Sequence, residues 1–148
     1  MRLICTQFEN NTMEGKLIVL RHESYELMGL LFQVHRELGS ICKEKNYCDA
    51  IEKLLLKKDY DYKREATVRI PFDGDYLDGF RADFIISNNI ILEVKATSFI
   101  KQEFIRQTLR YLKATKLPLG IVANFKRQSL EYKRIINKEC INLKNYLS

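Results

Sequence analysis

The 148-residue sequence lacks several features that would mark a membrane-bound, secreted or linker-divided protein. It has no tryptophan, only two prolines and six glycines, and no Pro/Gly/Ser-rich linker divides it. Its apolar runs fall far short of the roughly 18 residues that a transmembrane helix needs, and its N-terminal stretch does not resemble a signal peptide. We therefore expect one soluble, cytoplasmic domain over residues 1–148, large enough to bury a core of its own.

Cysteine is scarce and is not spaced for metal binding. The four cysteines are widely scattered and form no C-x2-C pair: Cys5, Cys42, Cys48 and Cys140. Because zinc and iron–sulfur sites usually need such pairs, we expect free thiols.

Acidic residues are fewer than basic residues in this chain. The chain has 25 Lys and Arg residues against 19 Asp and Glu residues. This excess permits a polyanionic partner, but only clustering of the positive charge on one face would make it a nucleic-acid footprint.

The chain does have a regular apolar periodicity, which changes along its length. Helical spacing predicts three helices, the first with Ser24 as its N-cap, over residues 24–38, 42–58 and 99–116. Alternation of apolar and polar residues, or a short unbroken apolar run, predicts four strands. They cover residues 62–72, 77–86, 90–96 and 119–125. Asp73-Gly74 is a typical hairpin turn. Residues 16–20 are expected to form an edge strand, and residues 130–137 either an edge strand or a short helix.

The predicted order ααβββαβ indicates an α/β or α+β fold, with a mixed sheet covered by helices. The strand over residues 119–125 follows a helix, so it should pair parallel to the strand over residues 90–96 through a right-handed crossover.

The hairpin RADFIISNNIILEVKA, residues 81–96, carries two acids where an ordinary core hairpin would carry none. A three-residue Ser-Asn-Asn loop would pair Ile86 with Ile90 and place Asp83 opposite Glu93. A two-residue loop would send the two carboxylates to opposite faces. Two carboxylates about 5 Å apart repel by roughly 3 kcal/mol at an effective dielectric constant of about 20, so the pairing requires compensation.

A hard divalent cation would provide that compensation. Mg²⁺ takes oxygen ligands such as Asp83, Glu93 and the Val94 carbonyl while it keeps several waters. Lys95 would then hold a phosphate oxygen or orient the attacking water. Arg81, predicted opposite Lys95, could contact phosphate or pair with Glu93. A simpler interpretation stays open, in which Asp83 and Lys95 form a surface ion pair and Glu93 faces solvent.

Asp83 and the Glu-Val-Lys of residues 93–95 resemble the signature of the PD-(D/E)xK nuclease superfamily, and the longer pattern resembles its GxxExxY family. The resemblance covers about residues 24–137 and rests on five stretches in the family's order: VHRELG (34–39), GFRADF (79–84), LEVKA (92–96), QTLRYL (107–112) and GIVANF (120–125). In the motif that names the family, Glu44 and Tyr47 are present, but Ile41 replaces the glycine and Ser40 the preceding proline. Residues 1–23 and 138–148 lie outside the resemblance.

This resemblance implies a restriction-endonuclease-like core and a nuclease that uses Mg²⁺ or Mn²⁺ to hydrolyse phosphodiester bonds in DNA, leaving a 5′-phosphate. Asp83, Glu93 and Lys95, together with Glu44, would be its catalytic residues. Two other functions stay open: a nucleic-acid-binding or assembly subunit that does not cut, and an RNA-directed nuclease. A homodimer or a protein complex is compatible with either, because one small domain offers limited surface to span a duplex.

Three further residues, Glu44, Gln107 and Tyr111, are candidates for the site. Glu44 lies along the apolar stripe of its predicted helix, so we expect it to point inward, where an acid needs a cation. By resemblance it would join the metal site; the alternative is a solvated helix-end glutamate. Gln107 and Tyr111 share a helix face, and by resemblance they would steer the substrate strand, although an exposed Gln and an ordinary Tyr would fit the same spacing. His35, like His22, has no acid–base partner in the sequence, so we expect a structural or surface role.

Overall fold

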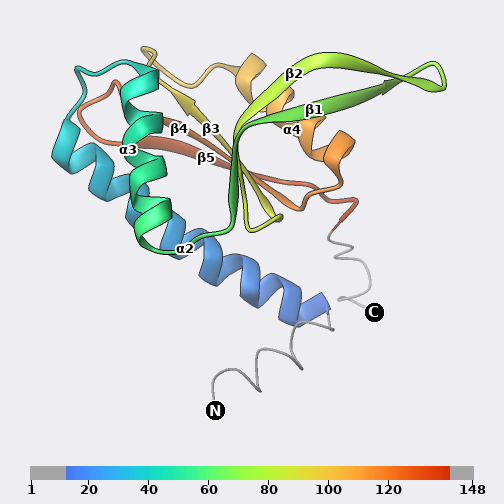
Figure 1. Cartoon of the computed structure of the whole chain (residues 1–148), viewed down its shortest axis with the longest axis horizontal. Helices are drawn as coiled ribbons and strands as arrows, with labels where there is room; N and C mark the ends of the chain where they lie inside the picture. The colour runs from blue at the N-terminus through green and yellow to red at the C-terminus, as the bar shows by residue number, and fades with distance from the viewer. Residues whose placement is uncertain (1–12, 141–148) are drawn as a thin grey trace.

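A computed structural model describes residues 13–140 and shows one sheet with helices on both of its faces (Figure 1). The elements are α2 (Met13–Leu38), α3 (Glu44–Lys57), β1 (Tyr62–Phe72), β2 (Asp75–Ile86), β3 (Ile90–Lys95), α4 (Gln102–Thr115), β4 (Leu119–Asn124) and β5 (Glu131–Ile136). The sheet order is β1-β2-β3-β4-β5, with β3 and β4 parallel and the other neighbours antiparallel. The predicted mixed sheet and its parallel crossover are confirmed, and residues 131–136 form a strand rather than a helix.

The sheet separates two apolar cores. Helices α2 and α3 cover one face with fully buried side chains such as Leu27, Leu31 and Ile51, and α4 covers the other face with Leu112. Strand β3 contributes to both cores, since Ile90, Leu92 and Val94 face α2 and α3 while Ile91 faces α4. A strand buried on both faces carries an almost continuous apolar run, so the single acid within β3, Glu93, stands out.

The N-terminal prediction is wrong. Residues 16–20 do not form an edge strand but lie inside α2, which begins at Met13, and Ser24 is a buried residue of this helix rather than its N-cap. No glycine or proline interrupts residues 16–28, so a helix nucleated further along can propagate backward through the apolar run. Among the described helices, none is both long and apolar enough to span a membrane.

Both hairpin turns follow the predicted geometry. Asp73 and Gly74 have positive φ angles of 49° and 77° at the tip of the β1–β2 arm, as a two-residue hairpin turn requires. Figure 1 shows this arm extending beyond the rest of the sheet. In the second turn, Ser87 and Asn88 also have positive φ angles, and Ile86 pairs with Ile90, which confirms the three-residue loop.

The three cysteines within residues 13–140 are free thiols. Burial and the nearby charge of Asp83 raise the pKa of Cys48 to about 12, so this thiol stays protonated and unreactive. Cys42 and Cys140 are half-buried, and Cys5 lies outside the described residues.

Gly120 lets α4 pack directly on β4. A Cβ atom at this position would lie 2.6 Å from Thr108 Cγ2 and 3.2 Å from Leu112 Cδ1, whereas a Cβ atom at Gly29 in α2 would have nothing within 4 Å. We expect Gly120→Ala to lower the free energy of unfolding by about 1–3 kcal/mol through overpacking. Gly29→Ala should raise it by roughly 0.5–1 kcal/mol through helix propensity. Urea unfolding of the two variants measures the difference, and equal stabilities would contradict the close α4–β4 packing.

Candidate active site

The candidate site lies where β2 and β3 separate. Their ladder runs from Ile86↔Ile90 to Phe84↔Leu92 and ends there. Beyond it, side chains replace the backbone partners: the Asp83 N–H donates to Glu93 Oε1 at 3.4 Å, and the Val94 N–H donates to Asp83 Oδ2 at 2.7 Å. The predicted meeting of the two acids is therefore present, one step past the end of regular pairing.

The other edge of β2 is also irregular at this position. Strand β1 pairs with β2 at Phe84 and at Ala82 but not at Asp83, and Glu65, which would be the partner of Asp83, has a positive φ of 49°. Phe84 packs in the α2/α3 core whereas Ala82 packs in the α4 core, although residues two apart in a regular strand share a face. The backbone of β2 therefore changes its facing at Asp83 and leaves the Asp83 N–H free to bind a side chain.

Glu93 is a buried carboxylate next to a second acid. It is 5% exposed, and burial, followed by the charge of Asp83, raises its pKa to about 8, while Lys95 acts in the opposite direction. Within residues 13–140, no basic side chain forms an ion pair with it. Burying a charge without such a partner is costly, so the metal-free site disfavours the ionised pair.

Lys95 lies at the end of β3 and is held by an aromatic ring. Its Nζ atom lies 4.5 Å from the centroid of Phe104 in α4, and Nζ of Lys101 lies 5.9 Å from the same centroid. Lys95 makes no ion pair with Asp83, so among the described residues the predicted surface ion pair does not form. The ammonium group keeps its three donors for other partners.

Helix α4 places Gln107 and Tyr111 beside the two acids. The Gln107 amide donates to the Tyr111 hydroxyl at 2.9 Å. Tyr111 is buried, and its pKa is raised by desolvation and then by the charge of Glu93, against the Gln107 hydrogen bond. These residues line an open pocket of about 390 Å³ together with Phe80, Glu103, Phe104, Arg106 and Arg110. Asp83, Glu93 and Lys95 do not line this pocket, but it adjoins the site through Phe104, the ring that Lys95 contacts.

Two expectations about site residues are wrong. Glu44 is the first residue of α3 and is exposed, so it does not point inward. Helix α3 starts two residues later than predicted, which places Glu44 in the open first turn rather than in a continuous stripe. Arg81 is exposed and does not pair with Lys95, because the β2–β3 ladder ends before it.

The side chains of Asp83 and Glu93 suit a hard cation. Two carboxylates, one buried and lacking an ion-pair partner, match the few protein ligands that Mg²⁺ takes while it keeps several waters. Among the described residues, no group of three His, Cys, Asp or Glu side chains is close enough to hold an ion. The two acids would thus provide the side-chain ligands, with water completing the shell.

One supporting network was not found from the sequence. The Asn124 side chain accepts from the Thr97 N–H at 3.0 Å and donates to the Thr97 carbonyl at 2.9 Å, and it also donates to Glu131. Glu131 in turn accepts from the Ile100 N–H at 2.8 Å. These contacts fix the chain that follows Lys95. A polar residue ending a buried strand is the signal that could have indicated them.

His35 has a structural role. Its Nε2 atom lies 2.9 Å from the Arg127 carbonyl oxygen, and its ring contacts Phe125. His22 is exposed and faces Glu26 one helical turn away at 3.2 Å.

Comparison with known proteins gives one family match and two similar structures. The sequence profile of the PD-(D/E)XK nuclease superfamily matches residues 21–135. The crystal structure of SSO0001 is similar with a TM-score of 0.50 and 19% identity, covering 69% of this chain and 56% of that chain. An alkaline exonuclease, LHK-Exo from Laribacter hongkongensis, has a TM-score of 0.43 and 10% identity, covering 65% and 57%. The chain thus spans just over half the length of each, and no curated protein sequence matches it.

Proposed function

The chain belongs to the PD-(D/E)XK nuclease superfamily and has a restriction-endonuclease-like fold, and from this premise we propose that it is a metal-dependent nuclease that hydrolyses phosphodiester bonds in DNA. The observation that carries the proposal is the convergence of Asp83 and Glu93 at the point where β2 and β3 separate. A carboxylate that is buried next to a second acid, as Glu93 is, destabilises a fold unless a cation or a proton neutralises it, so the presence of this pair favours a function over a structural role.

Asp83 and Glu93, with the Val94 carbonyl, would hold Mg²⁺ or Mn²⁺. When bound, such an ion activates water and offsets the negative charge that develops on the phosphate. The hydrogen bond from the Val94 N–H fixes the Asp83 carboxylate, and the burial of Glu93 excludes bulk water from that side. Exposed Glu44 would reach the metal only through water or when substrate is bound.

The basic and polar groups around this pair would bind the substrate. Lys95 would hold a phosphate oxygen or orient the attacking water, since its ammonium makes no ion pair among the described residues. Gln107, with its partner Tyr111, and exposed Arg81 would contact the nucleic-acid strand. Contacts to phosphate give salt-sensitive and largely sequence-independent binding. By likeness to the superfamily, the product would carry a 5′-phosphate.

Within the superfamily we assign the chain to the GxxExxY branch. Tyr47 supports this assignment because its hydroxyl donates to the Gly39 carbonyl at 2.6 Å and accepts from the Cys42 N–H at 3.3 Å. The tyrosine thereby closes the loop before α3. Ile41, which stands at the glycine position of the motif, projects into solvent at 93% exposure, so the loop accommodates this departure.

We further assign residues 1–148 to a single nuclease domain that acts in the cytoplasm, alone, as a homodimer or in a protein complex. The free thiols among the described residues fit a reducing compartment.

A cleavage assay tests the nuclease proposal. Wild type should cut labelled DNA in the presence of Mg²⁺ or Mn²⁺. Asp83→Asn and Lys95→Ala should each lower the rate by at least about 100-fold, because Asp83 would hold the metal and Lys95 would act on the reacting phosphate. Lys101→Ala is the matched control, since Lys101 lies over the same Phe104 ring; it should keep most of the activity. Parallel reactions with single- and double-stranded DNA and RNA identify the substrate class.

Binding of nucleic acid without metal-dependent cutting would contradict the nuclease proposal and favour a non-catalytic subunit. Preferential cutting of RNA would support the proposed metal-dependent hydrolysis but would show that the substrate is RNA rather than DNA. If Lys101→Ala lowered the cleavage rate as much as Lys95→Ala, Lys95 would contribute only general positive charge.

A further inference from the structure

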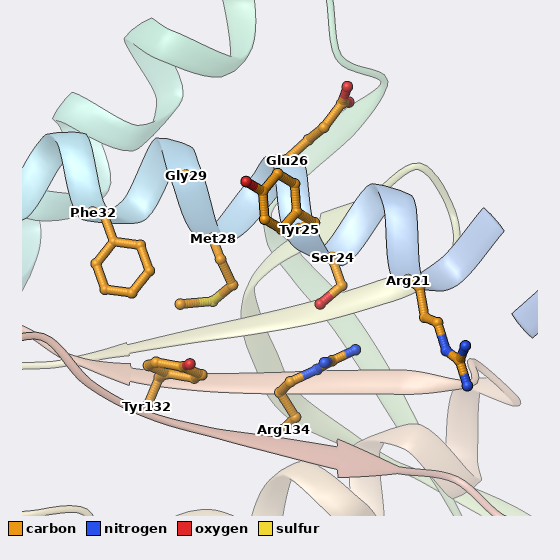
Figure 2. A pocket seen from close by; sticks show the side chains of 9 residues that line it. All are labelled: Arg21, Ser24, Tyr25, Glu26, Met28, Gly29, Phe32, Tyr132 and Arg134. Atoms are coloured by element: carbon orange, nitrogen blue, oxygen red, sulfur yellow. The ribbon is translucent and has the colours of Figure 1, made fainter. Parts of the chain in front are cut away.

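A second groove lies between α2 and β5, one of the two edge strands of the sheet. It has a volume of about 510 Å³. Figure 2 shows the side chains that line it: from α2, Arg21, Ser24, Tyr25, Glu26, Met28, Gly29 and Phe32, and from β5, Tyr132 and Arg134. We call it the α2–β5 groove.

The groove is separate from the candidate active site. Tyr132 pairs with Ala123, which pairs with Val94, so Tyr132 lies two strands, or about 10 Å, from the β3 backbone. Ala123 and Val94 pack in the core under α2 and α3. Glu93 and Lys95 alternate with Val94 along β3 and lie on the opposite, α4 side of the sheet.

Exposed aromatic rings lie at the end of the α2–β5 groove that is opposite Arg21. Phe32 and Tyr132 meet edge to face, with ring centroids 5.9 Å apart, and they remain 37% and 40% exposed. Tyr25, on the rim, is 80% exposed. Gly29 leaves the helix surface open between them, since a Cβ atom there would meet nothing within 4 Å. Exposed rings beside open space can stack on planar groups.

Positive charge lies along the same groove. Figure 2 shows Arg134 reaching from β5 toward α2 and Arg21 at one end of the groove. Neither arginine forms an ion pair within the described part of the chain. The one acid, Glu26, points away from β5 and faces His22 at 3.2 Å. An anion in the groove would thus meet two guanidinium groups that make no ion pair with the described residues.

We propose that the α2–β5 groove binds a single-stranded segment of nucleic acid outside the catalytic centre, with bases stacked on Tyr132 and Phe32 and phosphates on Arg21 and Arg134. Aromatic platforms flanked by basic side chains are the usual means of binding single strands without sequence preference. A duplex keeps its bases stacked on one another, so it would use only the arginines. The inference rests on nucleic acid being the ligand, as proposed above, but not on cleavage.

Fluorescence anisotropy in EDTA with a labelled oligothymidylate of about 20 nucleotides tests the groove, because cleavage is then excluded. Tyr132→Ala should weaken binding by between about 5- and 150-fold. Arg21→Ala/Arg134→Ala should reduce the slope of log K against log salt by about 1.4, the loss of two single-strand phosphate contacts. Arg36→Ala/Lys53→Ala removes the same charge from exposed positions outside the groove and should change the slope much less.

Gly29→Leu provides a variant that blocks the groove without removing a contact. The added side chain enters open space and suits a helix, so circular dichroism should show a folded protein while binding of the single strand falls at least about 5-fold. An oligouridylate distinguishes RNA from DNA. Duplex binding should be affected by the arginine double variant but not by Tyr132→Ala.

The inference would be overturned if the groove variants bound the oligonucleotide as tightly as wild type does, or if wild type did not bind it at low salt. The first of these results would leave the groove as a surface for a protein partner. Wild type that binds through the groove but does not cut with Mg²⁺ would contradict only the nuclease proposal. Wild type that cuts, with groove variants that bind unchanged, would contradict only the groove inference.

Discussion

Replacing Glu93 with Gln should abolish metal-dependent cleavage and, at the same time, stabilise the metal-free protein. Because loss of a residue that merely supports a metal ligand costs about 10- to 100-fold, loss of a ligand itself should lower the rate by at least about 100-fold. In EDTA at pH 8, the free energy of unfolding should rise by roughly 2–4 kcal/mol, because the amide removes a buried charge beside Asp83. Urea unfolding and the cleavage assay, run on the same preparations, measure both effects.

The stabilising effect of Glu93→Gln should depend on pH in a defined direction. The pKa of Glu93 is about 8 in the folded protein, against 4.5 for an unperturbed glutamate. A carboxyl group whose pKa is raised by folding contributes its full stability below pH 4.5 and loses it as the pH rises toward 8. The stability of wild type should therefore fall across this window more steeply than that of the variant, and added Mg²⁺ should restore wild type alone.

The control for this comparison is Glu37→Gln, which alters an exposed carboxylate on α2 and should change neither stability nor rate appreciably. If wild type and Glu93→Gln have the same pH dependence in EDTA, Glu93 is not the buried, unpaired acid described above. If Glu93→Gln still cuts at the wild-type rate, the metal site lies elsewhere.

Tyr47→Ala should have the largest effect on stability. The Tyr47 side chain is fully buried, and its ring stacks on Phe125 with centroids 4.5 Å apart. Removing a buried aromatic side chain costs about 3–5 kcal/mol. Tyr47→Phe keeps the ring but leaves the Gly39 carbonyl without its hydroxyl partner, so it should cost about 1–3 kcal/mol. Thermal or urea unfolding distinguishes the two contributions.

Tyr25→Ala is the matched control for Tyr47, since Tyr25 is a helical tyrosine with 80% of its surface exposed. It should change the free energy of unfolding by no more than about 0.5 kcal/mol. If Tyr47→Ala lowered the free energy of unfolding no more than Tyr25→Ala does, α3 would not be anchored to the sheet through the Tyr47 ring.

Much of the fold was predictable because local patterns and tertiary structure agree. The three-residue loop before Ile90 and the Asp-Gly turn depend on residues that tolerate positive φ, and the alternation in β1 requires a pleated surface. The register set by the three-residue loop also predicted that Asp83 lies next to Glu93. Failures occurred where a pattern allowed two outcomes: the apolar run at residues 16–20 suits a strand or a helix, and helix propagation decided between them.

The amino-acid sequence thus contained the order of the elements, the hairpin register and the identity of the acid pair, because these follow from side-chain period and turn chemistry over short distances. Only the folded chain revealed that β2 changes its facing at Asp83, that Glu93 is buried with no ion-pair partner among the described residues, that Glu44 is solvent-exposed, and that the aromatic rings of α2 and β5 share a groove. Each of these depends on segments far apart in sequence and on how strands end and helices begin, where pairing rules no longer apply and packing decides.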